Sequence, residues 1–341
     1  MKKSAYFTLL LLIILLVIST LFSIRYGAVD LTLGEIGSGF SHLFSSTEAA
    51  SLNERIFLEI RLPRALLCIF VGASLALGGS LMQALFRNPI VEPGLIGTSS
   101  GAAFGAAICF VLGAQFQWDL GNWILPSFAC IGAVISTFLV LILSRSNETG
   151  ASSIQRLLLT GIAVNALFMS GVGFLSYIAR DPQARSITFW NLGTMAGANW
   201  PAVWVVGTST TICLLVAMRY AKELNALMMG ENEAAFLGIH IQQLKFKILL
   251  INVILVAVAT AYVGVIAFIG LIVPHLLRVF LGSDNRKLLL NSAILGGIIL
   301  NLADLAARLF LKPAELPIGI VSAVVGVPIF IMLLRHKNFQ F

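Results

Sequence analysis

The stretch that decides the fold is RLPRALLCIFVGASLALGGSLMQALFRNPIVEPGLIGTSSG, residues 61–101. Residues 65–86 carry no formal charge, and a run of this length is about what a helix rising ~1.5 Å per residue needs to cross a ~30 Å hydrocarbon layer. Asn88-Pro89 and Pro93-Gly94 then end a helix. We therefore predict a membrane span followed by a broken, polar segment. That segment must lie within protein or beside water, because lipid cannot satisfy its backbone.

The composition extends this interpretation to the whole chain. Of 341 residues, 58% are hydrophobic and 11% charged, and the mean hydropathy is +0.96, whereas about a quarter of a soluble domain is charged. The sequence thus predicts an all-α integral membrane protein. Its net charge of +7 is spread over short segments between apolar runs, which argues against nucleic acid as a partner and suits loops that face anionic lipid. The four cysteines are scattered without a C-x-x-C pair, which argues against a metal or disulfide site.

Apolar runs between charges or Pro and Gly residues predict about ten spans in a single transmembrane domain, 1–341. The first run, which follows Lys2-Lys3, is longer than a typical signal-peptide core and precedes no small-x-small cleavage site, so we interpret it as a helix. The seventh and eighth runs nearly merge. The predicted spans are residues 5–24, 65–86, 95–113, 123–143, 156–178, 198–218, 246–266, 269–281, 288–308 and 317–334.

Basic residues set the predicted orientation. With the N-terminus inside, 14 of the 22 Lys and Arg residues fall in inner segments, as the positive-inside rule requires. Ten spans then place both termini in the cytoplasm. Ser51 with Glu54 resembles a capping box, so the second helix is expected to begin well before Arg61 and to bend at Pro63.

Energy for any uphill movement has no evident source in this chain. No lysine follows a glycine, so the nucleotide loop G-x-x-x-x-G-K-[ST] is absent. Ion coupling would require titratable carboxylates inside the bilayer. Only Glu92 and Asp304 come close, and Asp304 stands four residues before Arg308, a helical ion-pair spacing. We expect a separate energising partner and no cofactor in this chain.

An inner segment, residues 224–243, is where such a partner could bind. Residues 224–229 are expected to form a short helix ending at Gly230, and a second one would follow with Asn232 as N-cap and Gly238 at the C′ position. Two short helices under the membrane would form a rigid knob. An ordinary amphipathic loop remains the alternative.

Two further features allow two interpretations each. Arg61 and Arg64 share a helical face on the outside, and Arg308 arrives at the same level. They could pair with acids of an extracytoplasmic partner, or they could reach lipid headgroups or pair locally with Glu59 and Asp304. At the inner end, Asn88 and Ile90 could gate a pathway or could form a simple reverse turn.

Together these motifs resemble the FecCD-type family, the membrane permeases of type II ABC importers for iron–siderophores, haem and cobalamin. The resemblance rests on five blocks in the order of the family: residues 61–102, 224–239 (LNALMMGENEAAFLGI), 267–290 (AFIGLIVPHLLRVFLGSDNRKLLL), 301–310 (NLADLAARLF) and 315–330 (ELPIGIVSAVVGVPIF). It implies a ten-helix permease fold, with several helices short or broken, that acts as a homodimer. It also implies two cytoplasmic ATPases, which bind ATP and Mg, an extracytoplasmic substrate-binding protein and a place in the bacterial inner membrane.

The resemblance also implies roles for individual residues. Arg61, Arg64 and Arg308 correspond to arginines that dock the binding protein, and Asn88 and Ile90 correspond to the cytoplasmic gate. The family's second gate lies near residues 152–156, where this sequence departs from the usual small polar pattern. The coupling helix, which contacts the ATPase, corresponds to Glu231, Ala234, Leu237 and Gly238.

The chain itself is expected to be non-catalytic and to transport by ATP-driven alternating access. An iron–siderophore or haem is the first candidate substrate, and cobalamin or an oxyanion such as molybdate is the alternative. From another class, a secondary transporter or a channel independent of ATP remains open.

Overall fold

The computed structural model describes residues 2–27, 29–44, 51–116, 121, 123–144, 151–312 and 314–335, and these form helices without strands. Among them, eight helices are long and apolar enough to cross a membrane, and two shorter apolar helices complete the set of ten that the sequence predicts. They are α1 (Lys2–Arg25), α4 (Leu62–Phe86), α5 (Thr98–Gln115), α6 (Ile124–Leu143), α7 (Ala151–Ile178), α9 (Trp200–Arg219), α12 (Ile241–Val263), α13 (Ile269–Leu281), α14 (Asn285–Phe310) and α15 (Ile318–Arg335).

The second span begins before Arg61, as predicted. Ser51 Oγ accepts from the Glu54 N–H at 3.2 Å and Glu54 Oε2 accepts from the Ser51 N–H at 3.0 Å, which completes the capping box. The chain then runs through α3 (Leu52–Arg55) and a π-helical turn, Ile56–Arg61, into α4. Regular α-helical hydrogen bonding is therefore interrupted directly before Pro63, close to the predicted bend.

The centre of the molecule is α4, which packs against α9, α12, α13 and α14. Its glycines allow this close approach: a Cβ at Gly72 would meet the backbone of Gly296 in α14, and one at Gly79 would meet the backbone of Gly270 in α13. Small residues at helix crossings let backbones touch where lipid offers no hydrophobic drive for association. The stretch that opens the sequence argument thus forms the core.

The broken segment after α4 folds back into protein, as predicted. Residues 93–96 form a 3-10 turn, and Val91 and Ile96 are buried. The Asn252 amide in α12 donates to the Pro93 carbonyl at 3.1 Å, and Glu92 Oε1 accepts from the Phe268 N–H, at the start of α13, at 3.1 Å. Polar groups of neighbouring helices therefore satisfy a backbone that lipid could not.

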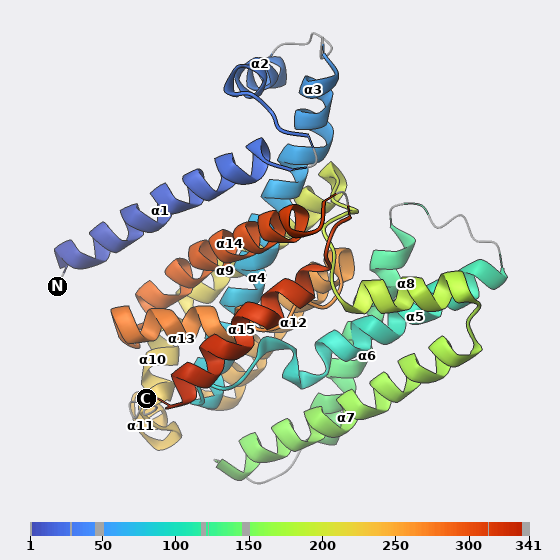
Figure 1. Ribbon diagram of the computed structural model, residues 1–341. Coiled ribbons are helices and arrows are strands. Elements are labelled where there is room, and N and C mark those ends of the chain that lie inside the picture. Colours follow the sequence, from blue (N-terminus) through green and yellow to red (C-terminus); the bar gives the residue numbers. More distant parts are fainter. Residues whose placement is uncertain are drawn as a thin grey trace.

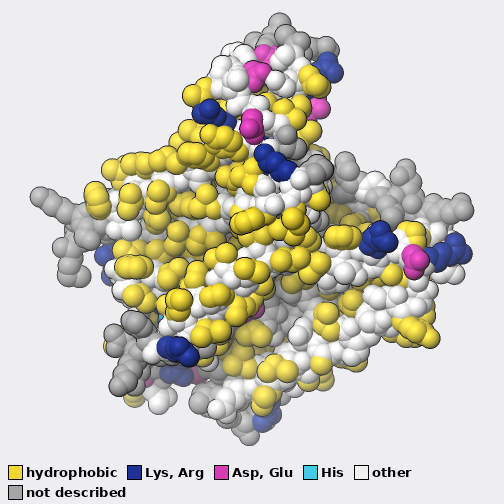
Figure 2. All heavy atoms as spheres, viewed as in Figure 1, with side chains coloured by type: hydrophobic (Ala, Val, Ile, Leu, Met, Phe, Trp, Pro, Cys, Tyr) yellow, Lys and Arg dark blue, Asp and Glu magenta, His cyan; other side chains and the backbone are white. Residues whose placement is uncertain are grey.

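The two ends of the bundle carry different short helices (Figure 1). α10 (Ala221–Met229) and α11 (Glu231–Phe236) lie at the end where both ends of the described chain are found. At the opposite end lie α3 and two helices that the sequence did not predict, α2 (Leu33–Phe44) and α8 (Asp181–Asn191). Figure 2 shows hydrophobic side chains across the body between these ends, with charged ones mainly toward the ends, as a membrane-spanning bundle requires.

Candidate functional site

The gate segment, residues 87–92, is a tight turn. Arg87 ends α4 in the left-handed conformation, with φ 50°, and the Asn88 N–H donates to the Gln83 carbonyl at 3.2 Å. Asn88 Oδ1 in turn accepts from the Ile90 N–H at 3.0 Å. The Ile90 side chain points away from the core, since the residue is 44% exposed. The predicted reverse turn is present, and the gating role of Asn88 and Ile90 stays a prediction.

The two predicted short helices under the bundle are α10 and α11. α10 ends at Gly230 as expected, but the prediction that Asn232 caps the second helix is wrong. Gly230 itself, with φ 152°, is the N-cap, and the helix begins at Glu231. A single glycine makes the whole turn between the helices, so no further residue is needed for a cap. Gly238 lies at C′ with φ 80°, as predicted, and donates to the Ala235 carbonyl at 2.9 Å.

The faces of α11 differ sharply. Ala234 is fully buried, whereas Phe236 is 90% and Leu237 66% exposed. Met229, at the end of α10, is 73% exposed. We call Met229, Phe236 and Leu237 the apolar knob. The resemblance named Leu237 as a coupling residue and gave Met229 and Phe236 no role, although an aromatic residue two positions before the helix-ending Gly238 is a visible signal.

Buried amides fasten α10 to the start of α14. Asn225 Oδ1 accepts from the Asn285 N–H at 2.8 Å and from its side-chain amide at 2.9 Å, and Asn285 is fully buried. The Asn225 amide donates to Asp284 Oδ1 at 2.7 Å. Asp284 is the N-cap of α14. Hydrogen bonds from the Arg286 side chain, with those from Asn225, lower the pKa of the Asp284 carboxyl to about 2.

The opposite end holds a buried ion-pair network, which we call the outer arginine cluster: Arg61, Arg64, Arg308, Asp304 and Glu315. Arg64 Nη2 lies 2.8 Å from Asp304 Oδ1 and 2.9 Å from Glu315 Oε2. Arg308 Nε reaches the other oxygen of Asp304 at 2.9 Å. The sequence spacing predicted the Asp304–Arg308 pair, but Glu315 comes from the α14–α15 connection and was missed.

Backbone carbonyls of the segment after α1 complete this cluster. Arg61 donates to the Tyr26 carbonyl at 2.7 Å and to the Val29 carbonyl at 2.9 Å, and Arg308 also donates to Tyr26 at 2.9 Å. Arg61, Arg64 and Arg308 are only 6%, 8% and 5% exposed. The structure therefore brings the three predicted arginines together, as internal partners of this chain. Glu59, the other predicted local partner, is exposed. Docking through the arginines stays a prediction.

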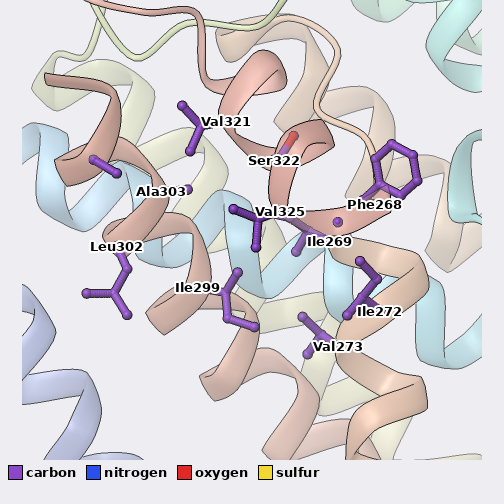
Figure 3. Close-up of a pocket in the computed structure, with 12 residues that line it drawn as sticks. Phe268, Ile269, Ile272, Val273, Ile299, Leu302, Ala303, Val321, Ser322 and Val325 are labelled. Carbon is purple, nitrogen blue, oxygen red and sulfur yellow. The ribbon is translucent and has the colours of Figure 1, made fainter. Parts of the chain in front are cut away.

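An apolar cavity of about 310 Å³ lies between α13, α14 and α15 (Figure 3). Its lining is apolar apart from Ser322 of α15. It includes Phe268, the N-cap of α13, with Ile272 of α13, Ile299 of α14 and Val325 of α15. Such a lining offers no charged group to hold a polar ligand. Among the residues that the structure describes, no group of three or more His, Cys, Asp or Glu could hold a metal ion. The predicted second gate falls at the start of α7, where the side chains of 151–154 lie outside the described residues.

The ten apolar helices of the described residues, the break that folds back beside the central helix and the pair of short helices at one end fit a multi-pass membrane permease. The comparisons agree with this class. The model of the FecCD transport family matches residues 14–336, and the chain belongs to that family.

Relatives span nearly the full length of the chain. It is 39% identical to the hemin transport system permease protein HmuU of Yersinia pestis over 329 residues, 96% of this chain and 95% of that protein. It is 38% identical to the vitamin B12 import system permease protein BtuC of Citrobacter koseri over 280 residues, 82% of this chain and 83% of that one. A solved inward-facing structure of a metal-chelate type ABC transporter matches with a TM-score of 0.83 at 30% identity, covering 98% of this chain and 99% of that one.

Proposed function

We propose that this permease is the membrane subunit of an importer driven by separate cytoplasmic ATPases and supplied by an extracytoplasmic binding protein, and that its substrate is haem or a similar iron chelate. ATP and Mg bind to the ATPases, and this chain is not itself an enzyme. The termini, α10 and α11 face the cytoplasm of a bacterial cell. The positive-inside distribution of Lys and Arg supports this orientation.

The apolar knob carries the proposal. Phe236 and Leu237 are 90% and 66% exposed at the end of α11. The adjoining α10 is held to α14 by the hydrogen bonds between Asn225 and Asn285. Large apolar side chains exposed together beside charged ones mark a surface for a protein partner. The knob belongs to α10 and α11, which lie at one end of the bundle (Figure 1), so a protein partner suits it better than lipid tails. A rigid support is what a coupling surface needs to pass a push from the ATPase into the bundle.

The substrate is inferred from the relatives. A hemin permease matches over 96% of the chain, which makes haem the first candidate. Vitamin B12 permeases match almost as well, so cobalamin is the main alternative, and an oxyanion such as molybdate is the third. An iron–siderophore is, like haem, a large iron chelate, so it stands beside haem as a candidate. All but the oxyanion are large and rigid, which suits a wide pathway with a weakly binding, apolar lining better than a tight polar site.

A second copy of the chain is the proposed partner within the membrane. Among the described residues, α15 packs against the neighbouring α13 and α14, and its first residues donate hydrogen bonds to the carbonyls of Leu192 and Gly193. Val324 and Met332 on α15 are each 68% exposed. On α7, Leu159 and Leu167 are 66% and 63% exposed. Faces of this kind would meet lipid or the second subunit, and a pathway between two copies would open and close as the subunits rock, with Asn88 and Ile90 at its inner end.

The binding protein is proposed to dock at the end that carries α2, α3 and α8. Acidic residues of the binding protein could reach Arg64 by replacing Glu315, which pairs with Arg64 and has a side chain that is 42% exposed. Arg61 and Arg308 are held by carbonyls behind it, so they would support the surface from below. The Glu315→Gln substitution distinguishes a docking role of Arg64 from a purely structural one. The altered chain should still fold and should bind the loaded binding protein at least as well as the unaltered chain.

Co-purification of the ATPase with the full chain tests the main proposal. Phe236→Glu and Leu237→Glu together should reduce the ATPase recovered by about tenfold, because two desolvated apolar contacts of this kind are worth ~1.4 kcal/mol or more. Asn232→Glu, an exposed polar residue on the same helix, is the matched control and should retain the ATPase. Equal recovery from both chains, or no ATPase with the unaltered chain, would contradict the proposal.

Reconstitution separates this function from the rival class. Vesicles that contain only this chain should accumulate no haem, ferric siderophore or cobalamin against a gradient. A secondary transporter would accumulate one of them when an ion gradient is imposed, and a channel would let it equilibrate. With the ATPase and the binding protein added, the solute that accumulates on addition of ATP identifies the substrate.

A further inference from the structure

The carboxylate of Glu231 lies where three elements meet. Its Oε1 atom is 2.9 Å from Lys245 Nζ and 4.0 Å from Arg87 Nη2. The side chains of Glu231 and Lys245 are only 11% and 12% exposed, and that of Arg87 is 31% exposed. One oxygen therefore faces two cations in a largely desolvated setting, where charge–charge interactions are stronger than at an open surface.

The positions of these residues in the chain give the contact its meaning. Glu231 is the first residue of α11, Lys245 is in the second turn of α12, and Arg87 is the last residue before Asn88. A movement of α11 therefore acts at once on α12 and on the start of the gate segment. Among the described residues, Glu231 is the only carboxylate within salt-bridge distance of either Lys245 or Arg87.

We propose that Glu231 is a positioning residue that links α11, the helix proposed to contact the ATPase, to the inner gate. Through Lys245 and Arg87, it holds the gate segment in register with α11, so that a displacement of α11 moves Asn88 and Ile90. This rests on the proposed function, which supplies the ATPase that displaces α11. Glu231 itself faces inward and does not contact the ATPase; that contact belongs to the apolar knob.

The loss of Glu231 has a defined consequence. Without its carboxylate, Lys245 and Arg87 would be left as two cations close to one another, and their repulsion would push the gate segment away from α12. The turn at Asn88 and Ile90 would then open more often without any movement of α11. A residue that merely stabilised α11 would leave the gate unaffected, which makes the accessibility of residue 90 the informative measurement.

The test labels a cysteine placed at the gate. In the full chain carrying Ile90→Cys, a membrane-impermeant maleimide is applied to inverted membrane vesicles and the labelling rate is measured. Of the native cysteines, three are buried and Cys130 is half-buried, so the chain without Ile90→Cys gives the background. Glu231→Gln should raise the rate about fivefold, as expected for the loss of a partly buried ion pair. Lys245→Met should raise it less, because Glu231 keeps Arg87.

Matched controls make the outcome decisive. Glu233→Gln removes the same charge two residues further along α11, where the side chain is exposed, and should not change the rate. Glu231→Gln added to a chain that already carries Arg87→Gln should change the rate by less than about twofold, because both changes break the same contact. An unchanged rate in Glu231→Gln alone, or an equally large effect of Glu231→Gln in the Arg87→Gln chain, would overturn the inference.

A second readout links the tie to transport. In the importer assembled with its ATPase, Glu231→Gln should leave ATPase co-purification unchanged but lower the solute moved per ATP hydrolysed by about threefold. An unchanged ratio would count against the inference. The labelling experiment needs no ATPase, so it tests the role of Glu231 by itself. Failure to recover any ATPase with the chain would contradict the proposed function but would not change the labelling result.

Discussion

The end of the bundle with α2, α3 and α8 and the end with α10 and α11 (Figure 1) hold their charges in different ways. At the outer end, Arg61, Arg64 and Arg308 are 5–8% exposed and are saturated by Asp304, Glu315 and backbone carbonyls. At the end that carries α10 and α11, the Glu231 carboxylate pairs with Lys245, whose side chain is 12% exposed, and at 4.0 Å with Arg87, whose side chain is 31% exposed. Phe236, further along α11, is 90% exposed. The arginines of the outer cluster have their partners within the chain, whereas the inner contacts lie on a helix that also carries exposed apolar side chains.

This difference teaches which end can move independently. A buried charge that loses its partner costs about 3–5 kcal/mol, whereas a partly exposed pair contributes about 0–1 kcal/mol. The outer arginine cluster joins α1, α4, α14 and the α14–α15 connection at such a cost that these elements must move together. The contact between Arg87 and Glu231, at 4.0 Å and with Arg87 31% exposed, belongs to the second kind and can be broken and remade at low cost.

Removing the centre of the outer arginine cluster should have the largest effect. Asp304→Ala would leave Arg64 and Arg308 buried without a carboxylate between them, so we expect a loss of about 3–5 kcal/mol in stability. Purified chain in detergent would show a strongly lowered Tm or would fail to accumulate. Glu315→Gln, which alters the half-exposed partner of the same Arg64, is the control and should cost about 1 kcal/mol or less. Equal effects of the two changes would contradict the contrast drawn between the ends.

Loosening α10 at the inner end should have a smaller and local effect. Asn225→Ala removes the acceptor of two amide protons of Asn285, and an unsatisfied buried donor costs about 1–3 kcal/mol. Amide hydrogen exchange should therefore rise in 221–237 and at the start of α14, with no change in α4 near Arg64. Asn232→Ala, at an exposed position, should leave exchange unaltered. Exchange that rises equally at both ends would show that the inner contacts are not local.

Much of this architecture could be predicted from the sequence, because the composition of a short stretch of residues is enough to identify a membrane span. All ten apolar runs became helices, and the capping box at Ser51 and the helix-ending glycine at 238 lie where their local chemistry demands. The broken segment after α4 was equally predictable, since Pro and Gly pairs act within a few residues. Spacing within one helix also identified the Asp304–Arg308 pair.

Contacts between distant segments could not be predicted in this way. Glu315 approaches Arg64 from 251 positions further along the chain, and Lys245 reaches Glu231 only because α12 folds back beside α11. Likewise, the capping signals placed Ala234 and Leu237 on one short helix but could not tell that the first is buried and the second exposed. Packing decides these points, and a single sequence does not contain them.

The smallest expected effect concerns the charge at the inner end of α14. Arg286 and Asn225 lower the pKa of Asp284 from 3.8 to about 2 in the folded chain. A carboxyl whose pKa is lower in the folded than in the unfolded state stabilises the fold at pH values above its unfolded-state pKa. It loses this contribution as the pH falls through its folded-state pKa.

Asp284→Asn should therefore lower the Tm slightly at neutral pH, by the equivalent of less than about 1 kcal/mol for so exposed a pair. The difference from the unaltered chain should vanish as the pH falls from about 4 to about 2. Lys287→Gln, which changes a charge in the same turn, should show no such convergence. If the Asp284→Asn difference instead persisted at low pH, the carboxylate charge would not be its source.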